Sequence, residues 1–306
     1  MAAGAEWGSA NLVGVMWSYD MGCQKREKAH NSSTGHWAVL VVATWKVLDF
    51  ATKNKTCRTC AASNKDKKCT PHDCCKNHCG SSKIIESNVA CELFKPAPAI
   101  GIKYDKYIGD ADSTTFALVK TNLSYGLEKI SDFVHTKRSL STRLCNLSQC
   151  QKFPNSFVLL QKVGNYLVKC FAYCVHQHKN QIEELAKAVQ CIVPHAFGDH
   201  SKCDVLWCCY KQNAAEYTHH EPTYGKDFHG SCLQLALQDR FSEYASPTVA
   251  SKVAPCLDSQ QNECLNEPLA PRILMYGIME EVGAAISELP VELLSTMKAT
   301  TSCAKH

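Results

Sequence analysis

The sequence predicts a mixed α/β fold, in which three antiparallel strands precede parallel strands that alternate with helices. Three apolar stretches near the start support this prediction: Leu12–Tyr19, Trp37–Thr44 and, after a short turn, Lys46–Phe50. Closely spaced apolar runs of this length are typical of buried strands joined in an antiparallel meander.

Helices and strands are then expected to alternate. We expect a helix at Ser87–Phe94 stopped by Pro96 and Pro98, a strand at Tyr104–Gly109, a helix at Ser113–Lys120, a strand at Glu128–His135 and a basic helix at Thr136–Leu147. Three strands followed by helix, strand, helix, strand, helix is the order of an RNase H-like fold.

The chain divides into three predicted parts. Residues 11–150 form the α/β core, with a Cys/His-rich zinc-binding loop at 56–80. Residues 151–245 form a mostly helical insertion, as in the Gln181–Val193 segment, where apolar residues recur on one helix face. After a connector rich in Ser, Pro and Ala, residues 259–280 supply a C-terminal helix of the core.

Composition limits the function classes. With 306 residues and 45% hydrophobic content the chain can form a substantial core, and the net charge of +4 is too small to indicate a nucleic-acid binder by itself. One local strip, Lys53–Lys83, carries eight basic and two acidic residues and is either a phosphate-binding surface or a solvated loop. The longest apolar run is far too short to span a membrane, so we expect no membrane association.

The 20 cysteines are expected to be reduced, because the first residues, MAAGAEWGSA, lack the charged and apolar regions of a secretory signal. Cys57, Cys60, His72 and Cys74 supply four ligands, enough for a tetrahedral zinc site. The surrounding loop has few apolar residues, so a metal would provide folding energy that a core cannot. Cys69, Cys75, His78 and Cys79 leave the ligand choice open, and unligated cysteines are the alternative.

A second group of zinc-ligand residues lies in the helical insertion: His195, His200, Cys203 and either Cys208 or Cys209. A buried histidine and ordinary core cysteines would produce the same pattern.

Three acidic residues occupy positions suited to phosphodiester chemistry. Asp20 and Asp110 are expected at the ends of neighbouring strands, and Glu263 on a helix that can pack across both. Cleavage and joining of DNA strands require two divalent cations held by carboxylates. The alternative for any one of them is that a strand-end aspartate caps a turn.

Seven motifs, taken together and in order, resemble the Mutator-like transposase domain of animal mobile elements. They are SYDMGCQKREKAHNSSTGH, KVLDFATKNKTCRTC, HDCCKNHCGSSK, GDADSTTF, KRSLSTRL, PHAFGDHSKC and SQQNECLN, and the resemblance runs from about residue 11 to residue 277. It implies a DDE-type DNA transposase, which nicks DNA and then joins the freed 3′-hydroxyl to target DNA with Mg²⁺ or Mn²⁺.

The resemblance places the acids of the triad on Asp20, Asp110 and Glu263, with Asp20 contacting both metals. Asp112 is the rival of Asp110, and Asp132 and Asp199 are weaker alternatives. The second Cys/His group would correspond to the Cys/His motif that such transposases carry between the second and third acids.

The implied partners are transposon ends and target DNA, bound in the nucleus by a homodimer when the enzyme is active. Lys25, Arg26, Lys137 and Arg138 are candidates for phosphate contacts, although charges on exposed helices often have no such role.

Some positions depart from the family pattern. Cys23 stands where tryptophan is usual, Glu27 where glycine is usual and Cys75 where a basic residue is usual, and Pro268 threatens the last helix. The segment that usually binds specific DNA is expected to be missing before the first strand. These features would also suit a truncated or decaying copy, or a catalytically inactive, co-opted DNA-binding module stabilised by zinc.

Overall fold

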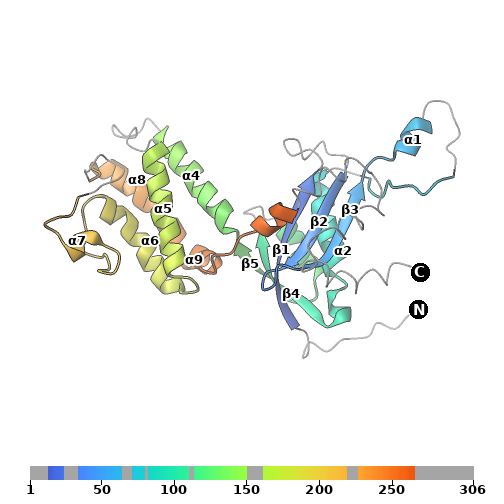
Figure 1. The fold of residues 1–306 in the computed structure, drawn as a ribbon, viewed down its shortest axis with the longest axis horizontal. Coiled ribbons are helices and arrows are strands. Elements are labelled where there is room, and N and C mark those ends of the chain that lie inside the picture. The colour runs from blue at the N-terminus through green and yellow to red at the C-terminus, as the bar shows by residue number, and fades with distance from the viewer. Residues whose placement is uncertain are drawn as a thin grey trace. The chain divides into compact units, whose positions relative to one another are not determined.

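The computed structural model describes residues 13–23, 34–63, 71–79, 82–109, 114–149, 161–218 and 227–265. The chain forms two compact units, and each is described by itself. The first contains residues 1–129 and 258–306, and the second contains residues 130–257. Figure 1 shows a sheet with its helices in the first unit and a bundle of helices in the second.

Five strands form one mixed sheet. They are β1 (Val13–Cys23), β2 (Thr34–Val41), β3 (Val47–Asn54), β4 (Ile102–Gly109) and β5 (Glu128–Ser131). The strand order is β3-β2-β1-β4-β5, in which β2 is antiparallel to both β1 and β3, and β4 runs parallel to β1. The predicted mixed α/β class and the opening antiparallel meander are therefore confirmed.

The core of the first unit is aromatic. Trp17 and Tyr19 of β1 and Trp37 of β2 are nearly inaccessible, and Phe94 and Tyr104 pack against Trp17. The covering elements are α2 (Ser82–Phe94), the short 3-10 helix η3 (Ala97–Ile100) and α3 (Thr114–Asn122). Because residues alternate along a strand, positions 17 and 19 of β1 face this core together.

One hydrogen bond fixes α2 on the sheet. The Tyr19 hydroxyl donates to the backbone carbonyl of Glu86 in α2 at 2.8 Å, so the aromatic side chain has a partner for its polar end.

Several strand boundaries differ from the sequence prediction: β2 lies three residues earlier than Trp37–Thr44, and β3 extends to Asn54 rather than to Phe50. Two further differences have a clear local cause. β1 continues past residue 19 to Cys23, because its pairing with β2 extends to Cys23 opposite Gly35. The segment predicted as strand Glu128–His135 is strand only to Ser131, because the buried Asp132 caps α4 (Phe133–Ser148). The Asp132 side chain accepts a hydrogen bond from the backbone N–H of His135 at 2.8 Å, which is the N-cap arrangement.

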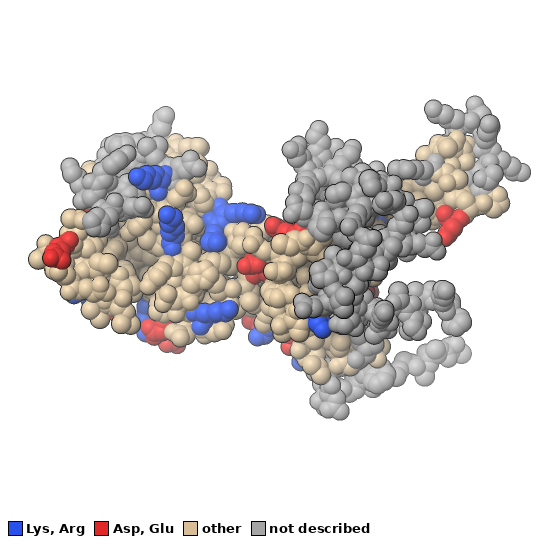
Figure 2. Space-filling view, in the orientation of Figure 1, with Lys and Arg blue, Asp and Glu red and all other residues tan. Residues whose placement is uncertain are grey.

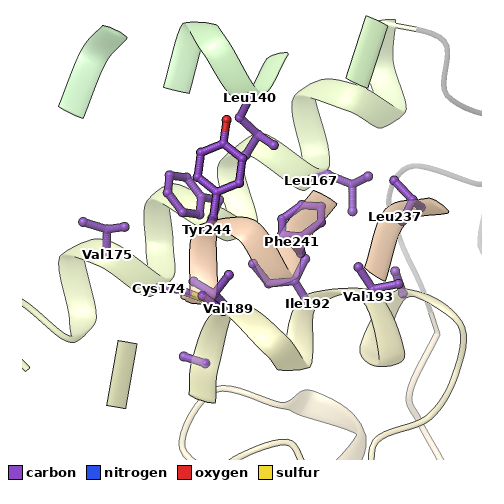
Figure 3. Close-up of a cluster of buried hydrophobic side chains, with 14 of the residues drawn as sticks. Leu140, Leu167, Cys174, Val175, Val189, Ile192, Val193, Leu237, Phe241 and Tyr244 are labelled. Carbon is purple, nitrogen blue, oxygen red and sulfur yellow. The ribbon is translucent and has the colours of Figure 1, made fainter. Parts of the chain in front are cut away.

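The second unit is helical. Besides α4 it contains α5 (Gln161–Gln177), α6 (Ile182–Ala196), α7 (Cys209–Gln212), α8 (Ser231–Ala245) and α9 (Pro247–Val253). Figure 3 shows its core, where Leu140, Leu167, Ile192 and Phe241 come from four different helices and are all 5% exposed or less.

The position of α4 differs from the domain division inferred from the sequence. α4 packs against α5 through Leu140 and Leu144, so the helical unit begins at Ile130 rather than at 151. The expected connector at 245–258 includes α9, whose Val253 is part of the same core.

A short helix at 260–265 follows the helical unit in sequence and belongs to the first unit. The backbone N–H of Gln260 donates to the side chain of Asp258, which favours a turn at the helix start. Asn262 and Leu265 are buried. None of the described helices combines the length and apolar character that crossing a bilayer requires.

Candidate metal centres and acidic residues

The first Cys/His group is assembled beyond the end of β3. The Nε2 atom of His72 lies 3.4 Å from the Sγ atoms of both Cys57 and Cys60, and the Sγ atoms of Cys60 and Cys74 are also 3.4 Å apart. All four potential ligand atoms lie within 4.8 Å of one another. Four residues spread over 18 positions of sequence therefore meet at one point.

Backbone contacts hold the two limbs of this loop together. Cys57 immediately precedes α1 (Arg58–Ser63), and its carbonyl accepts the N–H of Ala61. On the other limb, the backbone N–H groups of Asn77 and His78 both donate to the carbonyl of Asn54, the last residue of β3. The side chain of Asn77 returns a contact to the same strand by accepting the N–H of Asn54 at 2.7 Å.

The donor set and its spacing suit a zinc ion. With Zn–S bonds of about 2.3 Å and Zn–N bonds of about 2.0 Å, a tetrahedral site separates its ligand atoms by roughly 3.3–3.8 Å. The distances of 3.4 Å fall in that range. A backbone hydrogen bond from Cys60, assisted by His72, lowers the pKa of the Cys57 thiol to about 5, which favours its thiolate form. The neighbouring Cys74 thiol raises the pKa of Cys60.

Cys75, His78 and Cys79, the other described candidates of the loop, are not part of this group. The Sγ of Cys75 is directed to the carbonyl of Thr56 at 3.8 Å, and Cys79 is exposed. Cys69 lies outside the described residues. The Cys57, Cys60, His72 and Cys74 set is the group whose ligand atoms come together.

The second group lies in the helical unit, at the end of α6. The Nδ1 atoms of His195 and His200 are 3.1 Å apart, and the Sγ of Cys208 lies 3.5 Å from the Nδ1 of His200. The Sγ of Cys203 lies 3.5 Å from the Nδ1 of His195. These four ligand atoms also lie within 4.8 Å of one another. The two sulfur–nitrogen distances of 3.5 Å fall in the range of a tetrahedral zinc site, and the nitrogen–nitrogen distance of 3.1 Å is slightly shorter.

The turn between the two histidines depends on a glycine. His195 belongs to the last turn of α6, and Gly198 has φ of +80°, a conformation that residues with a Cβ rarely adopt. This reversal brings His200 back beside His195. Cys208 is fully buried in the group, whereas its neighbour Cys209 is exposed.

Aromatic rings surround and orient the imidazoles. Tyr210 is stacked on His200 with ring centroids 4.2 Å apart, and Trp207 meets the ring of His195 edge-on at 5.2 Å. Tyr217 packs edge-on against His200 at 5.1 Å. Such a shell restricts the orientations that the ligands can adopt.

Burial raises the pKa of the Cys203 thiol to about 12, and the nearby Cys208 thiol adds to this shift. A bound cation reverses this preference, since its charge favours the thiolate over the thiol. A metal bound there would therefore offset the unfavourable burial of these two thiols.

The three predicted catalytic acids belong to different segments of the chain, and two of them lie within the described residues. Asp20 lies inside β1 rather than at its end, where its Cα partner in β2 is Ala38. Asp110 directly follows Gly109 of β4 and lies outside the described residues. Glu263 is exposed on the helix at 260–265.

Sequence reasoning did not single out Asn262, which precedes Glu263. Its side-chain Nδ2 donates to the backbone carbonyl of Ala38 at 3.0 Å, and the residue is completely buried. The helix that carries Glu263 is thereby attached to the β2 residue that pairs with Asp20. An asparagine beside a presumed catalytic glutamate was the only sequence feature that pointed to this contact.

The rival acids have local structural contacts. Asp132 caps α4, and the Asp199 side chain accepts the backbone N–H of Ser201 at 3.0 Å within a turn. Hydrogen bonds from Ser201 lower the pKa of the Asp199 carboxyl. Asp112 lies outside the described residues.

Two of the four predicted phosphate-binding residues belong to the part of the chain that the structure describes. Lys25 and Arg26 lie outside the described residues, whereas Lys137 and Arg138 are on α4. Arg138 is exposed, and the ammonium group of Lys137 lies 4.7 Å from the ring centroid of Phe133.

Comparison with known families settles the relationship that the motifs suggested. The sequence model of the family described as Mutator-like transposase matches residues 4–208, about two thirds of the chain. The chain belongs to the Mutator-like transposase family. The region matched to this transposase family includes Asp20, Asp110 and both Cys/His groups and ends at Cys208, whereas Glu263 lies beyond it. Searches of curated proteins and of solved structures gave no match to the chain.

Proposed function

We propose that this chain is the catalytic domain of a DNA transposase with an RNase H-like fold, which cleaves and joins DNA strands with two divalent cations. The sheet order β3-β2-β1-β4-β5, with β2 antiparallel and β4 parallel to β1, supports this fold assignment. Membership of the Mutator-like transposase family supports the reaction class.

The hydrogen bond from Asn262 to Ala38 is the observation that carries the proposal. Ala38 is the partner of Asp20 across the β1–β2 pair, so the helix of Glu263 approaches the sheet beside Asp20 although 224 positions separate Asn262 from Ala38. Paired residues on adjacent antiparallel strands have Cα atoms about 4.5–5.5 Å apart. The backbone thus favours a meeting of the first and third acids.

The register of β1 with β4 favours Asp110 as the second acid of the triad. Ser18 pairs with Ile108, and Asp20 and Asp110 each follow two residues later along parallel strands. If this register continues, Asp110 becomes the direct neighbour of Asp20. The same count places Asp112 two residues farther along, which is why we assign Asp110 to the triad.

Carboxylate oxygens are the ligands that Mg²⁺ and Mn²⁺ prefer. In the proposed site Asp20, Asp110 and Glu263 would hold the two cations. The chemistry that such a pair of cations would supply is activation of the attacking oxygen and stabilisation of the leaving oxygen. The protein's part is to hold three carboxylates on separate elements at one place, while Asn262 positions the helix that bears the third.

We further propose that zinc occupies both Cys/His groups and has a structural role. Both sets are complete four-ligand sets without an open position, as is usual in structural rather than catalytic zinc sites. DNA is the proposed partner, in the nucleus, and a homodimer would process two transposon ends together.

The test is nicking of supercoiled plasmid DNA by the purified chain with Mg²⁺ or Mn²⁺. We expect nicking that Asp20→Asn and Glu263→Gln each abolish, whereas Glu128→Gln, which changes an exposed carboxylate of β5, leaves it intact. Comparison of Asp110→Asn with Asp112→Asn decides between the two rivals. Metal-independent DNA binding without any nicking would contradict the proposed enzymatic activity and would identify the chain as a co-opted DNA-binding module.

A further inference from the structure

Two neighbouring helices of the second unit carry basic residues and no acidic ones. α4 and α5 together contain Lys137, Arg138, Arg143, Lys162 and Lys169, and neither sequence includes Asp or Glu. The other long helices differ, since α6 contains Glu183 and Glu184, and α8 contains Asp239 and Glu243. The charge of the bundle is therefore unevenly distributed.

The exposed side of α5 is a single polar stripe. Five of its exposed residues recur every three or four positions and so share one helix face: Lys162, Asn165, Lys169, Tyr173 and His176. The opposite side is in the core, where Leu167 and Phe171 are fully buried. With a rise of 1.5 Å per residue, the stripe is about 21 Å long. Each of its side chains can donate a hydrogen bond.

Figure 2 shows one face of this unit, on which, among the described residues, Lys and Arg atoms lie over α4 and α5 without Asp or Glu atoms between them. Arg143 contributes less positive charge to this surface than its presence on α4 suggests. Arg143 forms an ion pair with Glu243 of α8 at 2.5 Å, which neutralises it. Arg138 on α4 and Lys162 and Lys169 on α5 are exposed.

We propose that the exposed stripe of α5, together with Arg138 of α4, binds the phosphate backbone of duplex DNA. The proposal rests on the proposed function, to which it adds a surface for the DNA. Duplex DNA presents about one negative charge per 1.7 Å of its axis, so a stripe of this length faces several phosphates. Side chains that donate hydrogen bonds, with no carboxylate between them, suit the regularly spaced phosphates of duplex DNA.

The same surface is less suited to a protein partner. Protein interfaces usually contain a buried apolar centre, and Tyr173 is the one large exposed hydrophobic residue on the described parts of α4 and α5. A tyrosine hydroxyl can itself contact a phosphate. Charge complementarity therefore decides in favour of DNA.

The test compares two double variants of the full chain that each remove two positive charges. Lys162→Gln/Lys169→Gln changes the stripe, and Lys187→Gln/Arg240→Gln changes exposed positions on α6 and α8. Affinity for a 30-base-pair duplex is measured by fluorescence anisotropy at several salt concentrations, without added Mg²⁺ or Mn²⁺. Circular dichroism and thermal unfolding confirm that both variants are folded.

The stripe variant should bind more weakly at low salt, and the slope of log affinity against log salt should decrease by about 2, close to 1 for each lost phosphate contact. The control variant should keep the slope of the unchanged protein. Equal losses in the two variants would overturn the proposal, since they would reflect net charge alone. So would binding to phosphatidylserine vesicles that the stripe variant loses while its DNA binding is unchanged.

Failure of this surface and failure of the proposed enzyme are distinguishable. If the stripe variant shows the expected change in slope but the chain never nicks DNA, the proposed DNA-binding surface stands and the proposed catalytic function is wrong. If the chain nicks DNA and both double variants bind DNA like the unchanged protein, the proposed function stands and the proposed DNA-binding surface is wrong.

Discussion

The side chain of Asn262 donates a hydrogen bond to the backbone carbonyl of Ala38 at 3.0 Å, and both residues are buried. This contact connects the helix at 260–265 to the middle of the sheet across 224 positions of sequence. A contact between segments so distant in sequence stabilises the sheet and, in our proposal, also positions the neighbouring Glu263.

Replacement of Asn262 with alanine should lower the free energy of unfolding by about 1–3 kcal/mol, because the buried carbonyl of Ala38 loses its side-chain donor. Denaturant unfolding followed by tryptophan fluorescence measures this loss. Gln261→Ala, at the exposed neighbouring position, is the control and should change stability by less than about 0.5 kcal/mol. Similar effects of the two substitutions would show that the contact has no special role.

Replacement of Cys60 with serine should remove one zinc ion from the chain and loosen only the loop beyond β3. Elemental analysis should give about two zinc ions for the unchanged chain and about one for the variant. Limited proteolysis should then cut near residues 57–79, while the sheet resists. Cys145→Ser, at an exposed cysteine of α4, should leave both zinc ions bound, and an unchanged zinc content in Cys60→Ser would rule out this ligand set.

Cys208 and Cys209 offer a matched pair of neighbours, since the first is fully buried in the second Cys/His group and the second is exposed. Cys208→Ala should lose zinc and several degrees of thermal stability in the helical unit, because a ligand and a buried side chain disappear together. Cys209→Ala should match the unchanged chain in both measurements. Loss of zinc from the Cys209 variant instead would reverse the assignment.

Asp132→Ala should destabilise the protein by about 0.5–2 kcal/mol, because the N-cap of α4 is lost. Asn accepts the same backbone hydrogen bond, so Asp132→Asn should retain most of this stability. Both variants should nick DNA at the rate of the unchanged protein. A loss of nicking in the stable Asp132→Asn variant would return Asp132 to the catalytic candidates.

The pH dependence of stability should include a contribution from Asp49. Burial raises the pKa of its carboxyl group, and the hydrogen bond from the backbone N–H of Phe50 opposes this shift. A raised pKa in the folded state favours folding below the unfolded pKa of about 3.9, and this contribution is lost as the pH rises through the folded value.

Asp49→Asn resembles the protonated residue, so it should raise the melting temperature at pH 7, and the difference from the unchanged chain should shrink as the pH falls toward 4. Thermal unfolding at both pH values measures the effect. Asp239→Asn, on the exposed side of α8, provides the comparison. A difference that grows with acidification would contradict the direction of the pKa shift.

Local patterns predicted the central elements well. The apolar runs around Trp17 and Trp37 identified strands because both residues are buried in the sheet core. The end of β1 was misplaced, since strand pairing with β2 extends the strand through Asp20, Met21, Gly22 and Cys23, which have no β-pattern of their own. The capping role of Asp132 was also missed, because a cap depends on where the next helix begins.

The candidate sites were predictable to different degrees. Cys57, Cys60 and His72 share a short loop, so their spacing alone indicated a common site. The approach of residue 262 to residue 38 could not be derived from spacing, because it depends on how a helix after the second unit returns to the sheet. The choice of Cys208 over Cys209 depended on burial, which sequence does not give for adjacent identical residues.

Trp17, Ser18 and Tyr19 are consecutive in β1, and the aromatic pair faces α2 and α3 while alternate positions face away from that core. Insertion or deletion of one residue between Trp17 and Asp20 would exchange the two faces and disturb both packing and the proposed chemistry. Selection for a stable fold alone would therefore also preserve the spacing that the proposed catalytic site requires. Under this proposal, the position of Asp20 in the sheet is kept by packing even in a copy that no longer cuts DNA.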